Sequence, residues 1–313
     1  MITRVLSGSD ENLDLFVCTL RSGQPIALPT ETVYGLAAPV TNEQALRAIF
    51  EIKGRPLHDP LIVHLHEFEE LDKWAEMSDV DKPLLERLTT KFWPGPLTII
   101  LPKKTGIPDL VTAGLKTAAF RVPAHPVFRE IIRRVGLPLA APSANPFQYI
   151  SPTRPAHVLS TLSGKIPYIV DGGSCDEGLE STIIDLSTSP PIVRRPGPID
   201  RKAIEAVLGQ GIKLETEQAD GSPTKAVSAP GNFTKHYAPR KPVLRLNSSE
   251  DKKGCDHVID FLELPSNPKE LRRQFYDRLI AADQSACERI ALINWPENLA
   301  DEALSDRLDR ALG

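Results

Sequence analysis

The sequence has little cysteine, and its cysteines are not spaced as metal ligands. Without a Cys-x-x-Cys pair, neither a structural zinc site nor a disulfide framework is indicated. The four residues are Cys18, Cys175, Cys255 and Cys287. No apolar run approaches the ~18 residues that a membrane-spanning helix needs, and acidic residues interrupt positions 1–20, where a signal peptide would be apolar. We therefore expect a reduced, cytoplasmic protein with no membrane partner.

Two common nucleotide-binding motifs are also missing. No Gly-x-x-x-x-Gly-Lys-[Ser/Thr] occurs, and no Gly-x-Gly-x-x-Gly follows a strand pattern, which argues against a P-loop ATPase and a standard dinucleotide-binding enzyme. The seven histidines show no zinc-ligand spacing. The net charge of −4 argues against a protein whose main task is to coat nucleic acid, because such proteins carry a net basic face. A local basic cleft is still compatible with this charge.

Proline, by contrast, is abundant. The 313 residues include 29 prolines, about twice the usual ~5%. Many of them end short apolar runs, as in Leu97–Pro102 and Leu139–Pro142, because proline cannot donate to a sheet ladder. The loops that follow such strands often carry binding groups.

Short apolar runs and amphipathic helical patterns alternate irregularly along the chain, which favours an α/β fold on a twisted, mixed sheet. The expected strands are 26–28, 61–65, 97–101, 118–122, 138–141, 168–170, 182–186 and 192–195, and the expected helices are 42–52, 81–93, 126–135 and 200–208. A second, smaller α/β unit is expected from strands at 243–246, 257–261 and 290–294 and helices at 268–282 and 299–312. We predict a catalytic domain over 1–208, a Gly- and Pro-rich linker over 209–242 that is a candidate active-site lid, and a small domain over 243–313.

Lys53-Gly54-Arg55-Pro56 is the first candidate for chemistry. It ends a helical pattern, and its two cations can reach one cleft, where Arg grips phosphate oxygens bidentately and Lys supplies a point charge. An ordinary helix C-terminus explains the same cations, because the helix dipole favours them there.

Other polar segments follow apolar strands, where open α/β sheets usually bind ligands. Thr30–Tyr34 and Ser143–Asn145 offer hydroxyls and an amide, and the glycines near Asp171 and Gly178 fit an anion-binding loop or a tight hairpin. Turn, capping or tight-hairpin roles also explain each segment when it is taken alone, and the hairpin is favoured for the glycine-rich one. Ser143 lacks the Gly-x-Ser-x-Gly context of a hydrolase nucleophile and an ordered base partner.

Taken together and in this order, these segments resemble the YrdC-type domain of the threonylcarbamoyl-AMP synthase family. The resemblance extends from about Pro25 to Ile199, and the linker and small C-terminal unit, expected to be Rossmann-like, resemble the two-domain form. It rests on PTETVYGLA, KGRP followed by PLIVH, FWPGPLT, RVPAHP, APSAN with SPT, DGG with GLESTIID, RRPGPI and the linker segment SAPGNFTKHYAP.

The resemblance implies that L-threonine, bicarbonate and ATP are converted to threonylcarbamoyl-adenylate and pyrophosphate, for threonylcarbamoyladenosine modification of tRNA. Lys53 and Arg55 would carry the catalytic charge stabilisation. Threonine would be held by Thr32, His64, Arg121 and Ser181. ATP would be bound by Lys53, Arg55, Asp59, Thr117, Ala141, Ser143, Asn145, Ser151, Arg195 and Tyr237.

The same resemblance implies Mg²⁺ bound with ATP, without dedicated protein ligands. The expected partners are the three substrates and the downstream tRNA threonylcarbamoyl-transferase machinery, with weak tRNA binding as a further expectation. One alternative is a non-catalytic module that binds structured RNA. Another is the carbamoyl-adenylate chemistry of hydrogenase maturation factors, which carry zinc-finger and acylphosphatase-type segments that are absent from this sequence.

Overall fold

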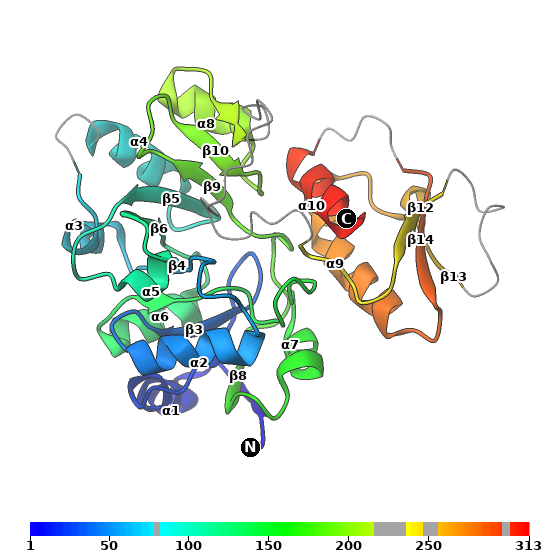
Figure 1. Cartoon of the computed structure of the whole chain (residues 1–313), viewed down its shortest axis with the longest axis horizontal. Coiled ribbons are helices and arrows are strands. Elements are labelled where there is room, and N and C mark those ends of the chain that lie inside the picture. Colours follow the sequence, from blue (N-terminus) through cyan, green and yellow to red (C-terminus); the bar gives the residue numbers. More distant parts are fainter. Residues whose placement is uncertain (78–81, 216–235, 247–255, 296–300, 313) are drawn as a thin grey trace.

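The chain forms two α/β units of unequal size (Figure 1). The computed structural model describes residues 1–77, 82–215, 236–246, 256–295 and 301–312. Over these residues the larger unit is built on an eleven-stranded sheet and the smaller on a three-stranded sheet. The predicted α/β class with a mixed sheet is confirmed. Residues 216–235, which make up most of the predicted linker, lie outside the described residues.

The large sheet combines parallel and antiparallel pairs. For example, β4 pairs in parallel with β6, whereas β2 and β3 are antiparallel. In spatial order its strands are β1 (Arg4–Ser7), β8 (Tyr168–Asp171), β2 (Ile26–Leu28), β3 (Gly35–Pro39), β7 (Leu139–Ala140), β4 (Ile62–His64), β6 (Thr117–Arg121), β5 (Leu97–Pro102), β9 (Thr182–Asp185), β10 (Ile192–Arg195) and β11 (Lys213–Leu214). The strand β11 lies within the range predicted as linker.

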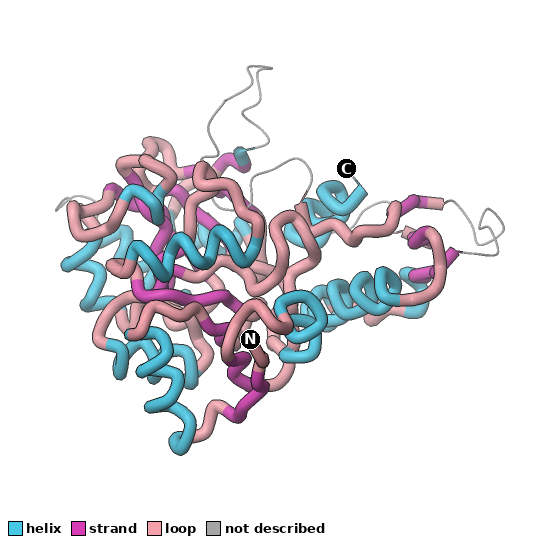
Figure 2. The backbone as a smooth tube through the Cα atoms, turned by 60° about the horizontal axis from the view of Figure 1, so that its bottom comes forward, coloured by secondary structure: helices cyan, strands magenta, loops and turns pink. Residues whose placement is uncertain are grey.

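Helices enclose this sheet on both faces, as the tube in Figure 2 shows. One apolar cluster joins α1 and α6 to the sheet through residues such as Phe16 and Phe128. A second cluster packs α2, α4, α7 and α8 through residues such as Ile49 and Leu88. The longer helices are α1 (Asp10–Arg21), α2 (Glu43–Lys53), α4 (Lys82–Phe92), α6 (Pro126–Val135), α7 (Pro155–Leu162) and α8 (Arg201–Leu208), and the short ones are η1 (Phe68–Glu70), α3 (Leu71–Trp74) and α5 (Asp109–Thr112).

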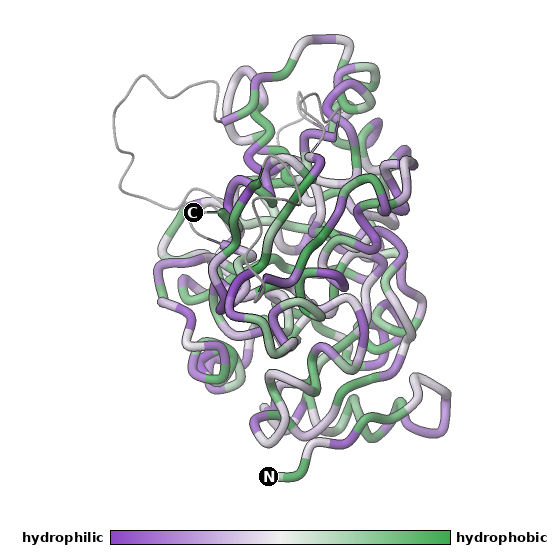
Figure 3. The backbone as a smooth tube through the Cα atoms, turned by 90° about the vertical axis from the view of Figure 1, so that its right-hand side faces the viewer, coloured by the Kyte–Doolittle hydropathy of each residue, from purple (hydrophilic) through white to green (hydrophobic). Residues whose placement is uncertain are grey.

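Several elements were not expected from the sequence: β1, α1, β3 and α7. The strand β3 contains a glycine, two alanines and a proline, and its segment reads as a loop. It becomes a strand because antiparallel pairing with β2 and β7 satisfies its backbone. The strand β1 is an exposed edge strand, so it lacks a continuous apolar pattern. Figure 3 shows that the interior strands are mostly hydrophobic and the outer loops largely hydrophilic.

The smaller unit is a parallel sheet in the order β12 (Val243–Arg245), β14 (Arg289–Ile293), β13 (Asp256–Asp260). The short η4 (Phe261–Glu263) follows β13, and α9 (Pro268–Gln284) and α10 (Glu302–Leu312) complete the unit. Its core includes Phe275, Leu279, Leu304 and Leu308, all fully buried. Asn267 caps α9 by accepting hydrogen bonds from the backbone N–H groups of the first turn.

Candidate active site

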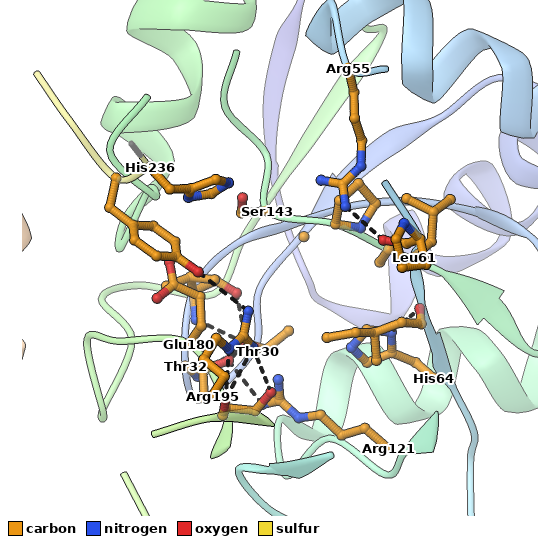
Figure 4. Close-up of a pocket in the computed structure, with 18 residues that line it drawn as sticks. Thr30, Thr32, Arg55, Leu61, His64, Arg121, Ser143, Glu180, Arg195 and His236 are labelled. Atoms are coloured by element: carbon orange, nitrogen blue, oxygen red, sulfur yellow. Dashed lines mark hydrogen bonds between the residues drawn. The ribbon is translucent and has the colours of Figure 1, made fainter. Parts of the chain in front are cut away.

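A pocket opens where several loops leave the large sheet (Figure 4). Its walls come from segments that are far apart in the sequence: the β2–β3 loop, the segment after α2, the ends of β4, β6, β7 and β10, the start of β9, and the chain that enters the C-terminal unit. The lining residues are Thr30, Thr32, Val33, Gly35, Arg55, Pro60, Leu61, Ile62, His64, Arg121, Ala141, Pro142, Ser143, Glu180, Ser181, Arg195, His236 and Tyr237.

The turn after α2 places its two cations in different roles. Gly54 ends the helix in the left-handed conformation (φ 63°), which lets the chain reverse there. Arg55 lines the pocket and pairs with the buried Asp59 at 2.8 Å. Lys53 is buried behind the pocket wall, and its Nζ donates to the carbonyl oxygens of Ser143 (2.6 Å) and Asn145 (2.5 Å). Lys53 therefore supports the 143–145 loop, while the guanidinium of Arg55 is the cation that faces the pocket.

Burial is the main influence on both cations of this turn. It lowers the pKa of Lys53 well below its usual value, with the positive charge of Arg55 as the next cause. Burial also lowers the pKa of Arg55, against the opposing effect of the Asp59 carboxylate. The two carbonyl oxygens on Lys53 and the carboxylate on Arg55 are therefore the partners that compensate these buried groups.

Arg121 forms a second polar cluster at the end of β6. Its Nη2 donates to Glu31 Oε1 at 2.7 Å and to Thr32 Oγ1 at 2.9 Å, while Nε donates to the carbonyl oxygen of Gly95. Glu31 also accepts from the N–H of Ala124, so both of its oxygens are bonded. The arginine is 3% exposed, and its guanidinium is held in one orientation on the pocket wall. A planar guanidinium so fixed suits a carboxylate ligand.

Ser181 and Arg195 form a further part of the pocket wall. Ser181 Oγ lies 2.7 Å from Thr98 Oγ1, and Arg195 Nη2 donates to the same Ser181 Oγ at 3.1 Å. Arg195 also donates to the Ser181 carbonyl oxygen, and its Nη1 lies 3.4 Å from the hydroxyl of Tyr237. The hydroxyl of Ser181 is therefore oriented from two sides.

His64 lies beside Arg121, because parallel pairing of β4 and β6 puts the two residues in register. The ring stacks on Phe128 with centroids 5.1 Å apart, and Nδ1 lies 3.2 Å from the carbonyl oxygen of Ile62. Burial, with a smaller effect from the charge of Arg121, lowers its pKa from 6.5 to about 3. His64 is therefore neutral near pH 7 and serves as a hydrogen-bonding group instead of a cation.

The structure brings nine of the predicted site residues onto the pocket wall: Thr32, Arg55, His64, Arg121, Ala141, Ser143, Ser181, Arg195 and Tyr237. Lys53, Asp59, Asn145 and Ser151 are buried and do not line it. Thr117 lines a different cavity, with Lys103 and Lys116. Thr117 is the first residue of β6 and Arg121 is the last. Because four residues of strand span about 13 Å, Thr117 lies at the end of β6 that is distant from the pocket.

Sequence reasoning missed Glu180, which lines the pocket and is 5% exposed. Burial tends to raise the pKa of this carboxylate, but the positive charges of Arg307 and Arg195 outweigh burial and lower it. Glu180 is therefore an anion near pH 7. Glu180 lies in the GLEST motif directly before Ser181, the serine expected to bind substrate. That position could have identified it as a pocket residue from the sequence. Thr30 and Glu31 lie in the candidate segment Thr30–Tyr34, but neither was assigned a binding role from the sequence. His236 lies in the linker motif and was not predicted as a site residue.

In the described part of the chain, no group of three or more His, Cys, Asp or Glu side chains is placed to hold a metal ion. Nor is any helix of that part both long enough and apolar enough to cross a bilayer.

Fold and pocket together define a two-domain α/β enzyme with an arginine- and hydroxyl-rich cavity. A family model described as "Telomere recombination" (Sua5, YciO and YrdC) matches residues 18–197, and the model of the threonylcarbamoyl-AMP synthase C-terminal domain matches residues 199–313. The chain is 42% identical over 233 residues to the threonylcarbamoyl-AMP synthase of Pyrococcus abyssi, covering 74% of this chain and 67% of that protein. It is 34% identical to the Bacillus subtilis enzyme of that name, covering 100% and 96%.

Solved structures show the same relationship. The crystal structure of P. abyssi Sua5 complexed with L-threonine superposes with a TM-score of 0.88 at 34% identity, covering 100% of this chain and 97% of that one. A variant of P. abyssi Sua5 with an adjacent histidine and tyrosine changed to alanine matches with the same TM-score at 31% identity, covering 100% and 96%. The chain belongs to the threonylcarbamoyl-AMP synthase family, and it is an enzyme of the adenylate-forming, nucleotidyl-transfer type.

Proposed function

We propose that this enzyme converts L-threonine, bicarbonate and ATP to threonylcarbamoyl-adenylate and pyrophosphate, and that the product serves threonylcarbamoyladenosine modification of tRNA. The observation that carries the proposal is that one pocket is lined both by Arg121 with Thr32 and by the two further arginines Arg55 and Arg195. Arg121 with Thr32 suits an amino acid, and the two further arginines suit phosphates. The relative complexed with L-threonine supports the same assignment.

The hydrogen-bond donors on the pocket wall indicate where threonine would bind. Arg121 would bind the threonine carboxylate, which would approach a guanidinium already fixed by Glu31. Ser181 and Thr32 would hydrogen-bond the threonine hydroxyl, and neutral His64 would add a polar contact without a second positive charge. These contacts would hold the amino nitrogen in one position for reaction with bicarbonate.

The chemical step needs positioning and charge neutralisation more than a strong base. Condensation of the threonine amine with bicarbonate gives a carbamate and water, and the carbamate is already an anionic nucleophile. Its oxygen would bond to the α-phosphorus of ATP as the α–β phosphoanhydride bond breaks and pyrophosphate leaves. Arg55 and Arg195 would neutralise the phosphate charge, and Lys53 would hold the 143–145 loop against the nucleotide.

We propose that ATP binds as its magnesium complex, which would neutralise part of the triphosphate charge. The carboxylates of Glu180 and Asp59 already form ion pairs with arginines. The metal ion would therefore be bound by the phosphate oxygens of ATP itself. Downstream, the product would pass to the machinery that transfers the threonylcarbamoyl group to tRNA.

The segment that enters the C-terminal unit would cover the nucleotide. His236 and Tyr237 line the pocket, and the N–H of Ala238 donates to the Gln148 carbonyl oxygen at 3.0 Å. The guanidinium of Arg240 lies 5.3 Å from the Tyr149 ring centroid. Changing Tyr237 to alanine is expected to raise the KM for ATP. An unchanged KM would argue against this covering role.

Pyrophosphate release from ATP, measured with and without threonine and bicarbonate, tests the reaction. Release should require both co-substrates and should fall sharply in Arg121→Met. The matched control is Arg134→Met, which removes a surface arginine from an ion-pair network outside the pocket and should leave turnover unchanged. Pyrophosphate release that ignores both co-substrates would reject the proposal, and RNA binding without turnover would favour the non-catalytic alternative.

A further inference from the structure

The C-terminal unit places an arginine against the pocket of the catalytic unit. Arg307, on α10, is 0% exposed, and arginine is rarely buried fully without partners. Its Nε donates to Glu180 Oε2 at 2.8 Å, and its Nη2 donates to the Pro196 carbonyl oxygen at 3.1 Å. Its guanidinium also lies 4.8 Å from the ring centroid of Tyr237. Three segments of the substrate pocket region therefore meet on one side chain of the other unit.

A second residue of the C-terminal unit contacts the same carboxylate. The hydroxyl of Tyr276, on α9, lies 3.1 Å from Glu180 Oε2 and 3.3 Å from Oε1. Tyr276 and Glu180 are both buried, and Glu180 immediately precedes Ser181 in the pocket wall. The buried carboxylate of Glu180 thus connects both helices, α9 and α10, to the part of the pocket wall that carries Ser181.

We propose that Arg307 is a positioning residue: it holds the Glu180 carboxylate and so leaves Arg195 to orient Ser181 and Tyr237. This role rests on the proposed function, because it assigns Ser181 to threonine and Arg195 with Tyr237 to ATP. The C-terminal unit thereby completes the active site without itself touching the substrates.

The charges around Glu180 explain why the arrangement depends on Arg307. The second positive side chain near Glu180 is Arg195, which now donates to Ser181 Oγ and to the Ser181 carbonyl oxygen. A buried carboxylate that loses its ion-pair partner is strongly unfavourable and recruits another cation. Without Arg307, Glu180 would draw Arg195 toward itself, and Ser181 and Tyr237 would lose the donor that orients them.

The same reasoning predicts that two damaging changes compensate each other. Arg307→Met leaves Glu180 without its cation. Glu180→Gln removes the anion between Arg307 and Arg195, while Arg307 keeps its ion pair with Asp306 on the same helix. In the double variant both charges are gone, so Arg195 is free to keep its contacts with Ser181. If Arg307 only filled space at the interface, its substitution would lower the melting temperature without changing the KM for threonine or ATP.

The test compares pyrophosphate release in the full chain for Arg307→Met, Glu180→Gln and the double variant. Each single change is expected to lower kcat/KM by about tenfold or more, mainly through the KM for threonine and ATP, and the double variant should return to within about threefold of wild type. Arg307→Lys keeps a charge and is expected to retain most of the activity.

The matched control is Arg272→Met at the same interface. Arg272 pairs with Asp301 at 2.6 Å and reaches Glu177 at 3.8 Å, but it does not line the substrate pocket. Its loss should lower the melting temperature and leave both KM values unchanged. A double variant no better than Arg307→Met, or Arg272→Met and Arg307→Met with the same kinetics, would overturn the proposal.

If Arg307→Met does not fold, the double variant decides. A folded, active double variant supports the role of Arg307, and an inactive or unfolded one overturns it. Threonine binding by calorimetry gives a readout that needs no turnover. If wild type released no pyrophosphate in response to threonine, the proposed reaction would fail, while the binding series would still report on Arg307.

Discussion

Adding a single methyl group at Gly178 should separate the two units and lower turnover. Gly178 has a left-handed backbone (φ +72°), and a Cβ there would lie 2.5 Å from the Cα of Arg273 and 2.7 Å from the carbonyl oxygen of Arg272. Carbon atoms in contact normally lie about 3.5–4.0 Å apart. Because both obstacles are backbone atoms of α9, the Gly178→Ala variant can be accommodated only if that helix moves by about 1 Å.

The expected loss of folding stability in Gly178→Ala has two parts. A left-handed alanine costs about 1–2 kcal/mol, and overpacking against a fixed backbone costs a further ~1–3 kcal/mol. Gly173→Ala separates the two parts, because Gly173 is also left-handed (φ +77°) but a Cβ there meets nothing within 4 Å. At about 2–4 °C per kcal/mol for a domain of this size, Gly178→Ala should melt several degrees below Gly173→Ala.

Turnover should separate the same two variants. A shift of α9 also moves Tyr276 away from Glu180, two residues beyond Gly178, so threonine-dependent pyrophosphate release should fall several-fold in Gly178→Ala only. Thermal unfolding and pyrophosphate release, measured on both variants, check the argument. Equal melting temperatures and equal turnover in the two would refute the close approach between this loop and α9 as a constraint on the enzyme.

Three further outcomes follow from the pocket. Valine should be turned over at least about 100-fold less efficiently than threonine, because the hydroxyl-binding groups would be left unpaired; equal kcat/KM values would contradict this. Thr98→Val removes a partner of Ser181 and should raise the KM for threonine about tenfold with little change in kcat, whereas Thr98→Ser should behave as wild type. The lowered pKa of His64 means that only the unfolded state binds its proton between about pH 6.5 and 3. Stability is then complete above pH 6.5 and falls on acidification, by about 2 kcal/mol at pH 5; pH-dependent melts should show a shallower loss in His64→Gln.

Local patterns in the sequence were sufficient for most of the regular structure. Proline-terminated apolar runs matched the strands β5 and β7, and the glycine of Lys53-Gly54-Arg55-Pro56 follows the last residue of α2. They failed for β3, which has a single large apolar side chain and forms a strand only because two neighbouring strands supply hydrogen bonds. The motif order also predicted which loops would meet, and Thr32, Arg121, Ser181 and Arg195 do line one pocket.

Only the tertiary structure decided how individual side chains are used. Lys53 and Arg55 are equivalent as cations two residues apart in a turn, yet Lys53 binds the carbonyl oxygens of a neighbouring loop and Arg55 faces the pocket. The ion pair between Glu180 and Arg307 joins residues 127 positions apart. Periodicity and capping act over a few residues, so they determine elements, whereas partners of buried charges are set by packing between elements that no local pattern encodes.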